Sequence, residues 1–300
     1  MNKILVSGAT GFVGSNLVPY LEINDFSVSP ISRAQLNSDN IDFTGSKYVI
    51  HLAGKAHDLK KTASDDEYFQ VNTNLTKSLF DQFLKSDCKV FIFMSSVKAA
   101  ADSVENHLDE NVIPNPFTAY GKSKLAAEQY ILSKPLPENK KVYILRPCMV
   151  HGPRNQGNLN LLFKLVSKGI PYPLGSFENK RSFLSVANLS LLIKDFIEQQ
   201  PSSGIYNIAD DTAVSSNHLV KLISRCIGKK PKILKVPKLV INIFARLGTW
   251  LNLPFNEESL SKLTKNYIVD TAKVKRELKT NFMLSTEEGL IKSIESFKSK

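Results

Sequence analysis

A tyrosine and a lysine four residues apart could carry out acid–base chemistry in this sequence. Tyr120 and Lys124 lie near the start of a predicted helix, and their spacing puts both side chains on one face. A lysine ammonium beside a phenol favours the phenolate and lowers its pKa from about 10 toward neutrality, so Tyr120 could take up and release a proton. Ser95 and Ser96 end a predicted strand and add hydroxyls at the sheet edge where α/β proteins bind ligands.

Three glycines after the first apolar stretch predict a dinucleotide site. The first predicted strand runs directly into Gly8, Gly11 and Gly14 and then into a helix. Gly8 allows a tight turn, Gly11 lets the backbone approach a diphosphate, and Gly14 lets the helix pack closely on the sheet. The helix N-terminus favours the anion, and Phe12 and Val13 are expected to contact it. The spacing is GxxGxxG rather than GxGxxG, but the strand before it and the helix after it favour a dinucleotide over an ordinary turn.

The end of the second predicted strand bears on which dinucleotide binds. A carboxylate there would bind the adenine-ribose hydroxyls of NAD, whereas this chain has Ser32 and Arg33, which could hold the 2′-phosphate of NADP. Arg33 could equally be a solvated loop residue, so both cofactors stay open, with NADP slightly favoured. Asp42, after a short third strand, could contact adenine or cap a turn.

These residues need a scaffold, and the chain order predicts an α/β fold with a Rossmann-type, doubly wound parallel sheet. Short apolar stretches alternate with helical patterns such as 67–84 and 120–132, which indicates βαβ units. We place a dinucleotide-binding domain at 1–155 and a smaller, mainly helical substrate lobe at 156–300, and the later strands near 183–186 and 204–209 could return to the first sheet. The predicted strands of the first domain are 3–7, 26–32, 48–52, 89–95 and 141–145.

Composition describes an ordinary globular chain of 300 residues with a formal charge of +11. Residues 221–300 contain 17 basic and 7 acidic residues, so most of the excess lies there. No nucleic-acid-binding motif accompanies it, and we expect no nucleic-acid partner. The three cysteines form no CxxC pair, so we expect neither a disulfide framework nor a bound metal. No signal peptide or spanning segment is predicted, and we expect a cytoplasmic protein.

Several motifs together resemble the nucleotide-sugar epimerase/dehydratase branch of the extended short-chain dehydrogenase/reductase family. They are the glycine turn, 49–54 (VIHLAG), Val71-Asn72, Ser95-Ser96, 120–124, Arg146-Pro147 and, near the C-terminus, 270–273 and 276–278. The resemblance implies that Ser96 hydrogen-bonds a substrate oxygen, Tyr120 moves its proton, and Lys124 holds the nicotinamide ribose. It further implies cofactor contacts from Leu52, Ala53, Gly54, Asn72 and Pro147.

The same resemblance implies a nucleotide-sugar substrate, with UDP as its expected nucleotide. Arg181 would grip the diphosphate, Asn158 and Leu159 would meet the nucleotide, and Leu174 and Phe183 would flank the base. Each could instead be structural: Arg181 as a surface ion pair, Leu174 as core. A second arginine expected near the C-terminal signature is missing, with Lys262 or Lys265 as substitutes, and Tyr267 would limit bulk at the sugar's second carbon.

The resemblance leaves two reactions open. Dehydration is disfavoured because Val97-Lys98-Ala99 follows the catalytic hydroxyl where dehydratases carry an acid pair. Reduction of a UDP-linked 4-keto-6-deoxy-N-acetylhexosamine in bacterial surface-polysaccharide biosynthesis ranks slightly ahead of UDP-sugar 4-epimerisation with tightly bound NAD. The lack of an acid after the second strand favours the reductase.

Other expectations concern partners and alternatives. The family implies a homodimer through the helices at 67–84 and 120–132. A redox-inactive dinucleotide-binding regulator is disfavoured by the intact Ser96, Tyr120 and Lys124. An enzyme acting on polyprenol-linked sugar at a membrane is motivated by the apolar stretch 238–255 near the basic cluster, but packing under a lid or at a subunit contact is the preferred explanation.

Overall fold

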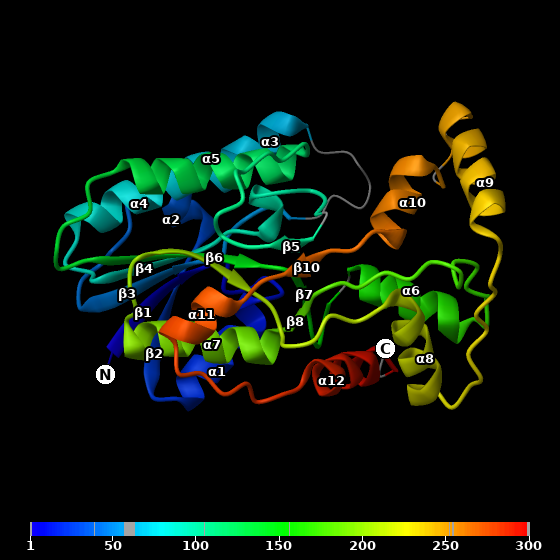
Figure 1. The fold of residues 1–300 in the computed structure, drawn as a ribbon. Coiled ribbons are helices and arrows are strands. Elements are labelled where there is room, and N and C mark those ends of the chain that lie inside the picture. Colours follow the sequence, from blue (N-terminus) through cyan, green and yellow to red (C-terminus); the bar gives the residue numbers. More distant parts are fainter. Residues whose placement is uncertain are drawn as a thin grey trace.

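A six-stranded parallel sheet forms the centre of the molecule (Figure 1). The computed structural model describes residues 2–38, 40–56, 64–104, 106–155, 157–251, 253 and 255–298. The strand order is β2-β1-β3-β4-β6-β9, so the predicted doubly wound α/β fold is confirmed. The strands are β1 (Asn2–Ser7), β2 (Phe26–Ile31), β3 (Ser46–His51), β4 (Val90–Met94), β6 (Lys141–Pro147) and β9 (Gly204–Ile208).

Both faces of this sheet are apolar and covered by helices. In β1, Ile4 and Val6 belong to one core cluster and Leu5 to the other, because neighbouring side chains of a strand point to opposite faces. One face is covered by α1 (Gly14–Ile23) and α7 (Val186–Gln199), and the other by α4 (Leu75–Lys85) and α5 (Ala119–Ser133) (Figure 1). Helices α2 (Arg33–Ser38) and α3 (Asp65–Phe69) complete this part of the chain.

The direction of winding reverses between β1 and β3. After β2 the chain crosses back over β1 and places β3 on its other side, and the next strand, β4, continues outward from β3. The connections at the carboxyl ends of β1 and β3 therefore lead away from each other and leave the crevice in which such sheets bind ligands.

Three local predictions were wrong in detail. Among the described residues between β2 and Asp42 there is no further strand: 40–43 have no regular structure and 44–45 form a turn, so the short third strand is absent there. The predicted helix 67–84 begins earlier and is interrupted by a π-helical segment, Gln70–Asn74, between α3 and α4. Strand β4 ends at Met94, so Ser95 and Ser96 both lie beyond it, before the 3₁₀ turn Val97–Ala99.

A second hydrophobic cluster lies in the C-terminal part of the chain. It is built mainly from helices α6 (Asn158–Ser167), α8 (Ser216–Cys226), α9 (Lys238–Trp250), α10 (Glu257–Thr264) and α12 (Thr286–Lys298). Two short parallel ladders adjoin it: β7 (Met149–His151) with β8 (Phe183–Ser185), and β5 (His107–Leu108) with β10 (Ile268–Val269), which precedes α11 (Ala272–Glu277). Of the two later strands, β9 pairs with β6 in the main sheet, whereas β8 does not join it. In the described part of the chain, no helix has the length and apolar character needed to cross a bilayer.

The contact between α1 and the glycine turn provides a test of the fold. A Cβ atom on Gly14 would lie 2.3 Å from the Gly8 carbonyl oxygen, whereas one on Gly11 would lie 3.3 Å from the same atom. We expect Gly14→Ala to lower the free energy of unfolding by about 1–3 kcal/mol, because backbone must move, and Gly11→Ala to have a smaller effect. Urea denaturation of both variants measures this; equal stabilities would contradict the packing described.

Candidate active site

One face of α5 carries three ionisable side chains. Tyr120, Lys124 and Glu128 are spaced four residues apart, and Lys124 and Glu128 are buried. Thr118 caps the helix by accepting a hydrogen bond from the Gly121 N–H, at 3.2 Å. A Cβ on Gly121 would lie 2.5 Å from the Lys98 carbonyl, so the helix starts in close contact with the turn after Ser96.

Lys124 is held at the carboxyl end of β4. Its Nζ donates to the Met94 carbonyl at 2.8 Å and lies 4.8 Å from the centre of the Phe93 ring. Burial lowers the pKa of Lys124 to about 8, and the Glu128 carboxylate acts in the opposite direction. A Cβ on Gly54 would lie 3.0 Å from Nζ and 3.0 Å from the Asn72 side-chain oxygen, so a side chain there would require these groups to move.

Tyr120 does not have the lowered pKa that its spacing from Lys124 predicts. Burial raises the pKa of Tyr120, while a hydrogen bond with Ser96 acts in the lowering direction. The Tyr68 ring lies edge-on, 6.4 Å from the Tyr120 ring, and raises the pKa further. This corrects the expectation of a phenol tuned by the neighbouring lysine: desolvation dominates, and the ammonium of Lys124 is directed to Met94 instead.

The two serines after β4 have different partners. Ser95 donates a hydrogen bond to Glu128. The same carboxylate accepts hydrogen bonds from Nε of Arg146 at 2.9 Å and from its Nη2 at 2.5 Å. Glu128 and Arg146 are almost completely buried. Ser96 has an extended backbone and accepts a hydrogen bond from the Lys98 N–H at 3.2 Å. Of the two hydroxyls, that of Ser96 is the one that acts on the pKa of Tyr120.

The glycine turn matches an anion site. Gly8 has φ +72°, and a Cβ there would lie 2.7 Å from the Ala53 nitrogen, so the turn is in contact with the segment that follows β3. The N–H groups of Phe12 and Val13 have no acceptor among the described residues. Free N–H groups at a helix start bind phosphate, and a cofactor diphosphate fits them.

Asn72 joins the cofactor loop to α5. Within the π-helical segment, its side chain accepts from the Lys55 N–H at 2.7 Å and donates to the Lys55 carbonyl and the Ser123 hydroxyl, both at 3.0 Å. It thus fixes the loop after Leu52, Ala53 and Gly54, as expected for a residue that steadies the strand beside the cofactor. π-Helical bulges occur often at functional sites.

A buried polar network supports the same loop. Thr76 donates to the Asn72 carbonyl at 2.7 Å and so accepts from Nε2 of His51 at 3.0 Å. Nδ1 of His51 accepts from Ser7 at 2.6 Å, and Ser7 accepts from the Ala53 N–H at 3.3 Å. Burial and, second, a nearby ammonium lower the pKa of His51 to about 3, so it stays neutral.

The residues expected to select the cofactor lie at exposed positions. Ser32 accepts from the Gln35 N–H at 3.2 Å and donates to its side chain at 2.8 Å, which caps α2. Arg33 is exposed at the start of that helix. Asp42 accepts from the Thr44 N–H at 2.9 Å, and this hydrogen bonding lowers its pKa, so the turn-capping alternative describes its place in this structure. Pro147 is buried at the end of β6.

The predicted substrate residues divide into two groups. Leu159, Leu174 and Phe183 are buried members of the second hydrophobic cluster, where they contribute to the core, and their contact with a nucleotide stays a prediction. Asn158 is exposed at the first position of α6. Arg181 is half-buried and donates to the Lys262 carbonyl.

Lys98 is a site residue that the sequence reading missed. Its Nζ donates to the Asp102 carbonyl at 2.7 Å and lies 4.3 Å from the centre of the Tyr267 ring. Burial lowers the pKa of Lys98 to about 8; Asp102 opposes this, and Arg181 and Lys262 lower it further. The sequence feature that could have identified Lys98 is its position two residues after Ser96.

Tyr267 ties the C-terminal part of the chain to the turn after Ser96. Its hydroxyl donates to the Ala101 carbonyl at 2.7 Å and to the Val97 carbonyl at 3.2 Å.

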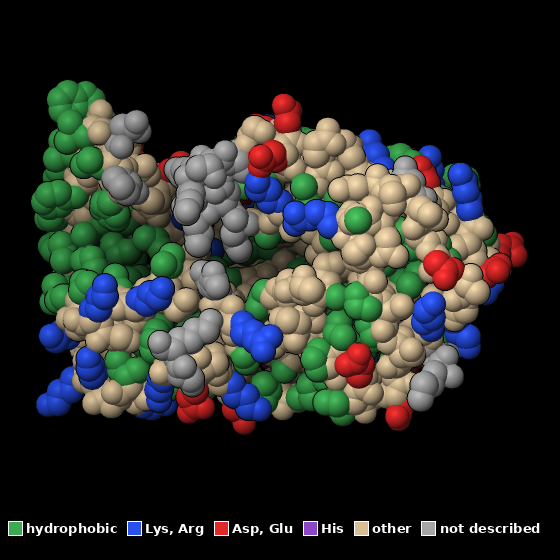
Figure 2. Space-filling model, turned by 180° about the vertical axis from the view of Figure 1, so that it is seen from behind, with side chains coloured by type: hydrophobic (Ala, Val, Ile, Leu, Met, Phe, Trp, Pro, Cys, Tyr) green, Lys and Arg blue, Asp and Glu red, His purple; other side chains and the backbone are tan. Residues whose placement is uncertain are grey.

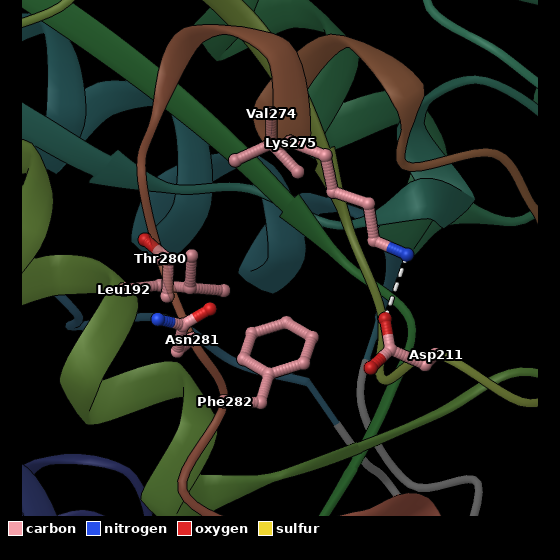
Figure 3. Close-up of a pocket in the computed structure, with 7 residues that line it drawn as sticks. All are labelled: Leu192, Asp211, Val274, Lys275, Thr280, Asn281 and Phe282. Carbon is pink, nitrogen blue, oxygen red and sulfur yellow. Dashed lines mark ion pairs between the residues drawn. The ribbon is translucent and has the colours of Figure 1, made fainter.

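A small hollow shown in Figure 3 contains none of the predicted site residues. It lies between α7, α11 and residues 280–282 and is bordered by the Lys275–Asp211 ion pair, at 2.6 Å. Among the described residues, no group of three or more histidine, cysteine or acidic side chains is placed to hold a metal.

The buried ammonium of Lys124 predicts a pH-dependent contribution to stability. Between pH 8 and about 10.4 the unfolded chain keeps a proton that the folded chain has lost, so raising the pH through this window stabilises the folded wild type. Relative to Lys124→Met, we expect the wild type to gain up to about 3 kcal/mol of unfolding free energy from pH 7 to pH 10. Urea denaturation at several pH values measures this, with Lys122→Met on the exposed side of α5 as the control. A pH-independent difference for Lys124→Met would contradict the account.

Comparison with known proteins agrees with this geometry. A model of the NAD dependent epimerase/dehydratase family matches residues 4–209. The UDP-glucose 4-epimerase of Vibrio cholerae is 30% identical, over 98% of this chain and 95% of its own length. The N-acetyl-alpha-D-glucosaminyl-diphospho-ditrans,octacis-undecaprenol 4-epimerase of Escherichia coli O157:H7 is 28% identical, over 92% and 85%. The dTDP-4-dehydro-6-deoxyglucose reductase of Escherichia coli is 24% identical, over 77% and 84%.

Solved structures share the fold over the whole chain. The UDP-glucuronic acid 4-epimerase of Bacillus cereus in complex with NAD has a TM-score of 0.75 at 20% identity, covering 99% of both chains. The RMD protein of Pseudomonas aeruginosa complexed with NADPH has a TM-score of 0.78 at 18% identity, covering 100% of both. With the family model spanning more than half of the sequence and a 30% identical relative spanning nearly all of it, the chain belongs to the NAD dependent epimerase/dehydratase family.

Proposed function

We propose that this enzyme catalyses NAD(P)-dependent oxidoreduction at carbon 4 of a hexose carried on a nucleoside diphosphate. Of the two candidate reactions, we favour 4-epimerisation of a UDP-sugar. The observation that carries the proposal is the meeting of Ser96, Tyr120 and Lys124 at the carboxyl edge of β4, one strand from the loop that contacts the glycine turn. The 4-epimerases of Vibrio cholerae and Escherichia coli O157:H7 match more than nine-tenths of the chain, which supports epimerisation over the reduction that the sequence alone ranks first.

The chain's own residues supply the proton chemistry. The nicotinamide cofactor that the glycine turn and Lys124 would hold would supply reversible hydride transfer at the sugar carbon. In its phenolate form, Tyr120 takes the proton of the 4-hydroxyl while the carbon–oxygen bond becomes a carbonyl, and it gives the proton back when the alcohol reforms. Because burial raises the pKa of this phenol, the hydrogen bond with Ser96 is needed to favour the phenolate. Ser96 hydrogen-bonds Tyr120 and the substrate oxygen, and Lys124 holds the cofactor ribose from the buried end of β4.

The substrate diphosphate fits the cations near the turn after Ser96. Arg181 and Lys262 both lower the pKa of Lys98, which indicates that these two cations lie near its ammonium. A doubly negative diphosphate relieves the repulsion between them. Lys98 and Lys262 take the place of the second arginine that the sequence lacks.

Reduction of a 4-keto sugar is the second candidate. It uses the same three residues, and the observation in its favour is the lack of an acid after β2, where Ser32 and the exposed Arg33 stand. In this reaction NADPH supplies the hydride and Tyr120 supplies the proton to the 4-oxygen.

The two candidates differ in the cofactor that purifies with the protein. We expect denatured enzyme to release NAD, and undenatured enzyme without added cofactor to interconvert UDP-glucose and UDP-galactose or their N-acetyl forms, measured by nuclear magnetic resonance. An empty protein that binds NADPH tightly and reduces a UDP-4-keto sugar would replace the epimerase by the reductase.

The role of Tyr120 is tested in the same assay. Tyr120→Phe is expected to lower kcat by about 10²- to 10⁴-fold with released cofactor unchanged. Tyr130→Phe, which removes the hydroxyl that donates to Asp81 on the same helix, is the matched control. Full activity of Tyr120→Phe would exclude this chemistry.

The hydrogen bond from Ser96 has a pH signature. Because this bond lowers the pKa of Tyr120, Ser96→Ala should raise that pKa and move the acidic limb of the kcat profile to higher pH, in addition to reducing kcat. An unshifted limb would mean that Ser96 binds substrate without tuning the phenol.

A further inference from the structure

Helix α9 carries large apolar side chains on the surface of the molecule. Trp250 is 81% exposed and Leu239 72%, and Ile243, Phe244 and Leu247 between them are also exposed. The spacings of three, four and seven residues place Leu239, Ile243 and Trp250 on one side of the helix, with Leu247 next to them. The apolar surface continues over Leu251, Leu253 and Phe255 and onto Leu263 of α10. Figure 2 shows it as a hydrophobic projection at one end of the molecule.

The opposite side of α9 is used for packing. Ile241, Ala245 and Gly248 are buried, and a Cβ on Gly248 would lie only 1.8 Å from the Phe255 carbonyl. The α9–α10 hairpin is therefore closely packed at Gly248, and its outer apolar side chains are directed away from the protein. Isolated exposed apolar residues are common, but a contiguous surface of this kind indicates an interface.

Charge indicates which partner covers this surface. Five lysines, 229, 230, 232, 235 and 238, are exposed in the segment that leads into α9, and α9 itself carries only Lys238 and Arg246 as charged residues. Nearby acids are paired, since Glu257 forms an ion pair with Arg246 at 3.5 Å and Glu258 forms one with Lys262 at 2.5 Å. A second copy related by a two-fold axis would bring the same cations together, whereas an anionic lipid surface complements them.

We propose that the α9–α10 hairpin binds the enzyme to the surface of an anionic membrane. Helix α9 lies in the plane of the interface with its apolar side among the upper parts of the acyl chains, and the lysines of 229–238 meet the lipid phosphates. Trp250 sits at headgroup level, where tryptophan is enriched in membrane proteins.

The chain contains a single tryptophan, so its fluorescence reports on this hairpin directly. We expect vesicles of phosphatidylglycerol and phosphatidylcholine to shift Trp250 emission to the blue and brominated lipids to quench it, with little change for pure phosphatidylcholine. Salt should weaken the binding because the lysines contribute through charge.

Matched variants distinguish binding through this surface from nonspecific adsorption to vesicles. Leu239→Asn should weaken vesicle binding at least tenfold, whereas Ile23→Asn, at an 81% exposed position on α1, should not. Lys230→Glu/Lys235→Glu should likewise lose binding, and the exposed pair Lys85→Glu/Lys89→Glu should retain it.

Two outcomes overturn the proposal. One is unchanged tryptophan emission with anionic vesicles. The other is a blue shift without lipid that grows with protein concentration, which would assign the surface to a second copy. None of these readouts uses turnover, so their failure leaves the proposed reaction standing, and failure of the reaction leaves membrane binding to be judged by itself.

Discussion

The buried ion pair between Glu128 and Arg146 is the interaction on which the site depends. Removing two charges from water is costly, and such a pair is tolerated only when its geometry and further hydrogen bonds are good. Here Arg146 on β6 makes three contacts with Glu128 on α5, and Ser95 after β4 adds another. The pair therefore fixes the rotation of α5 over two strands, and Lys124 and Tyr120, one and two turns earlier on the same face, are placed with it. Loss of either partner alone would leave a buried charge, which links the catalytic geometry to the stability of the core.

The residues at the carboxyl edge of β3 and β4 include several polar groups that are buried away from water. Lys124 is buried with a lowered pKa, His51 is held neutral, and the pKa of Tyr120 is raised by burial. The interruption of the α3–α4 helix by a π segment belongs to the same design, because it turns Asn72 toward both the cofactor loop and α5. Burying such groups is costly unless they are hydrogen-bonded, and His51 and Lys124 have partners within the protein. The surface of α9 lies outside this group of residues. The neighbouring helix α10 contacts Arg181, which donates a hydrogen bond to the Lys262 carbonyl.

Sequence patterns were sufficient for the parts of this structure that rest on local rules. The alternation of apolar strands with helices predicted the parallel sheet, and the glycine spacing predicted the contact of Gly14 with the first turn. Properties that depend on three-dimensional surroundings were not accessible in this way. The spacing of Tyr120 and Lys124 says that they share a face, but it cannot show that burial outweighs the ammonium, or that Lys124 turns to Met94. Likewise, Leu174 and Phe183 match a substrate motif in the sequence, whereas their burial depends on α6, α8 and α12, which pack from distant positions.

Hydride chemistry at carbon 4 on the face of α5 is the central claim, and isotopic labelling of the sugar tests it most directly. The enzyme is given a UDP-sugar with deuterium at carbon 4, and the label in the product is followed by mass spectrometry in ordinary water. The account predicts that the epimerised product keeps the deuterium, because hydride leaves and returns without meeting solvent, and that Tyr120→Phe forms this product about 10²- to 10⁴-fold more slowly. Wash-out of deuterium into water would contradict it, since it would mean that the carbon is deprotonated and that Tyr120 and Lys124 serve a different reaction.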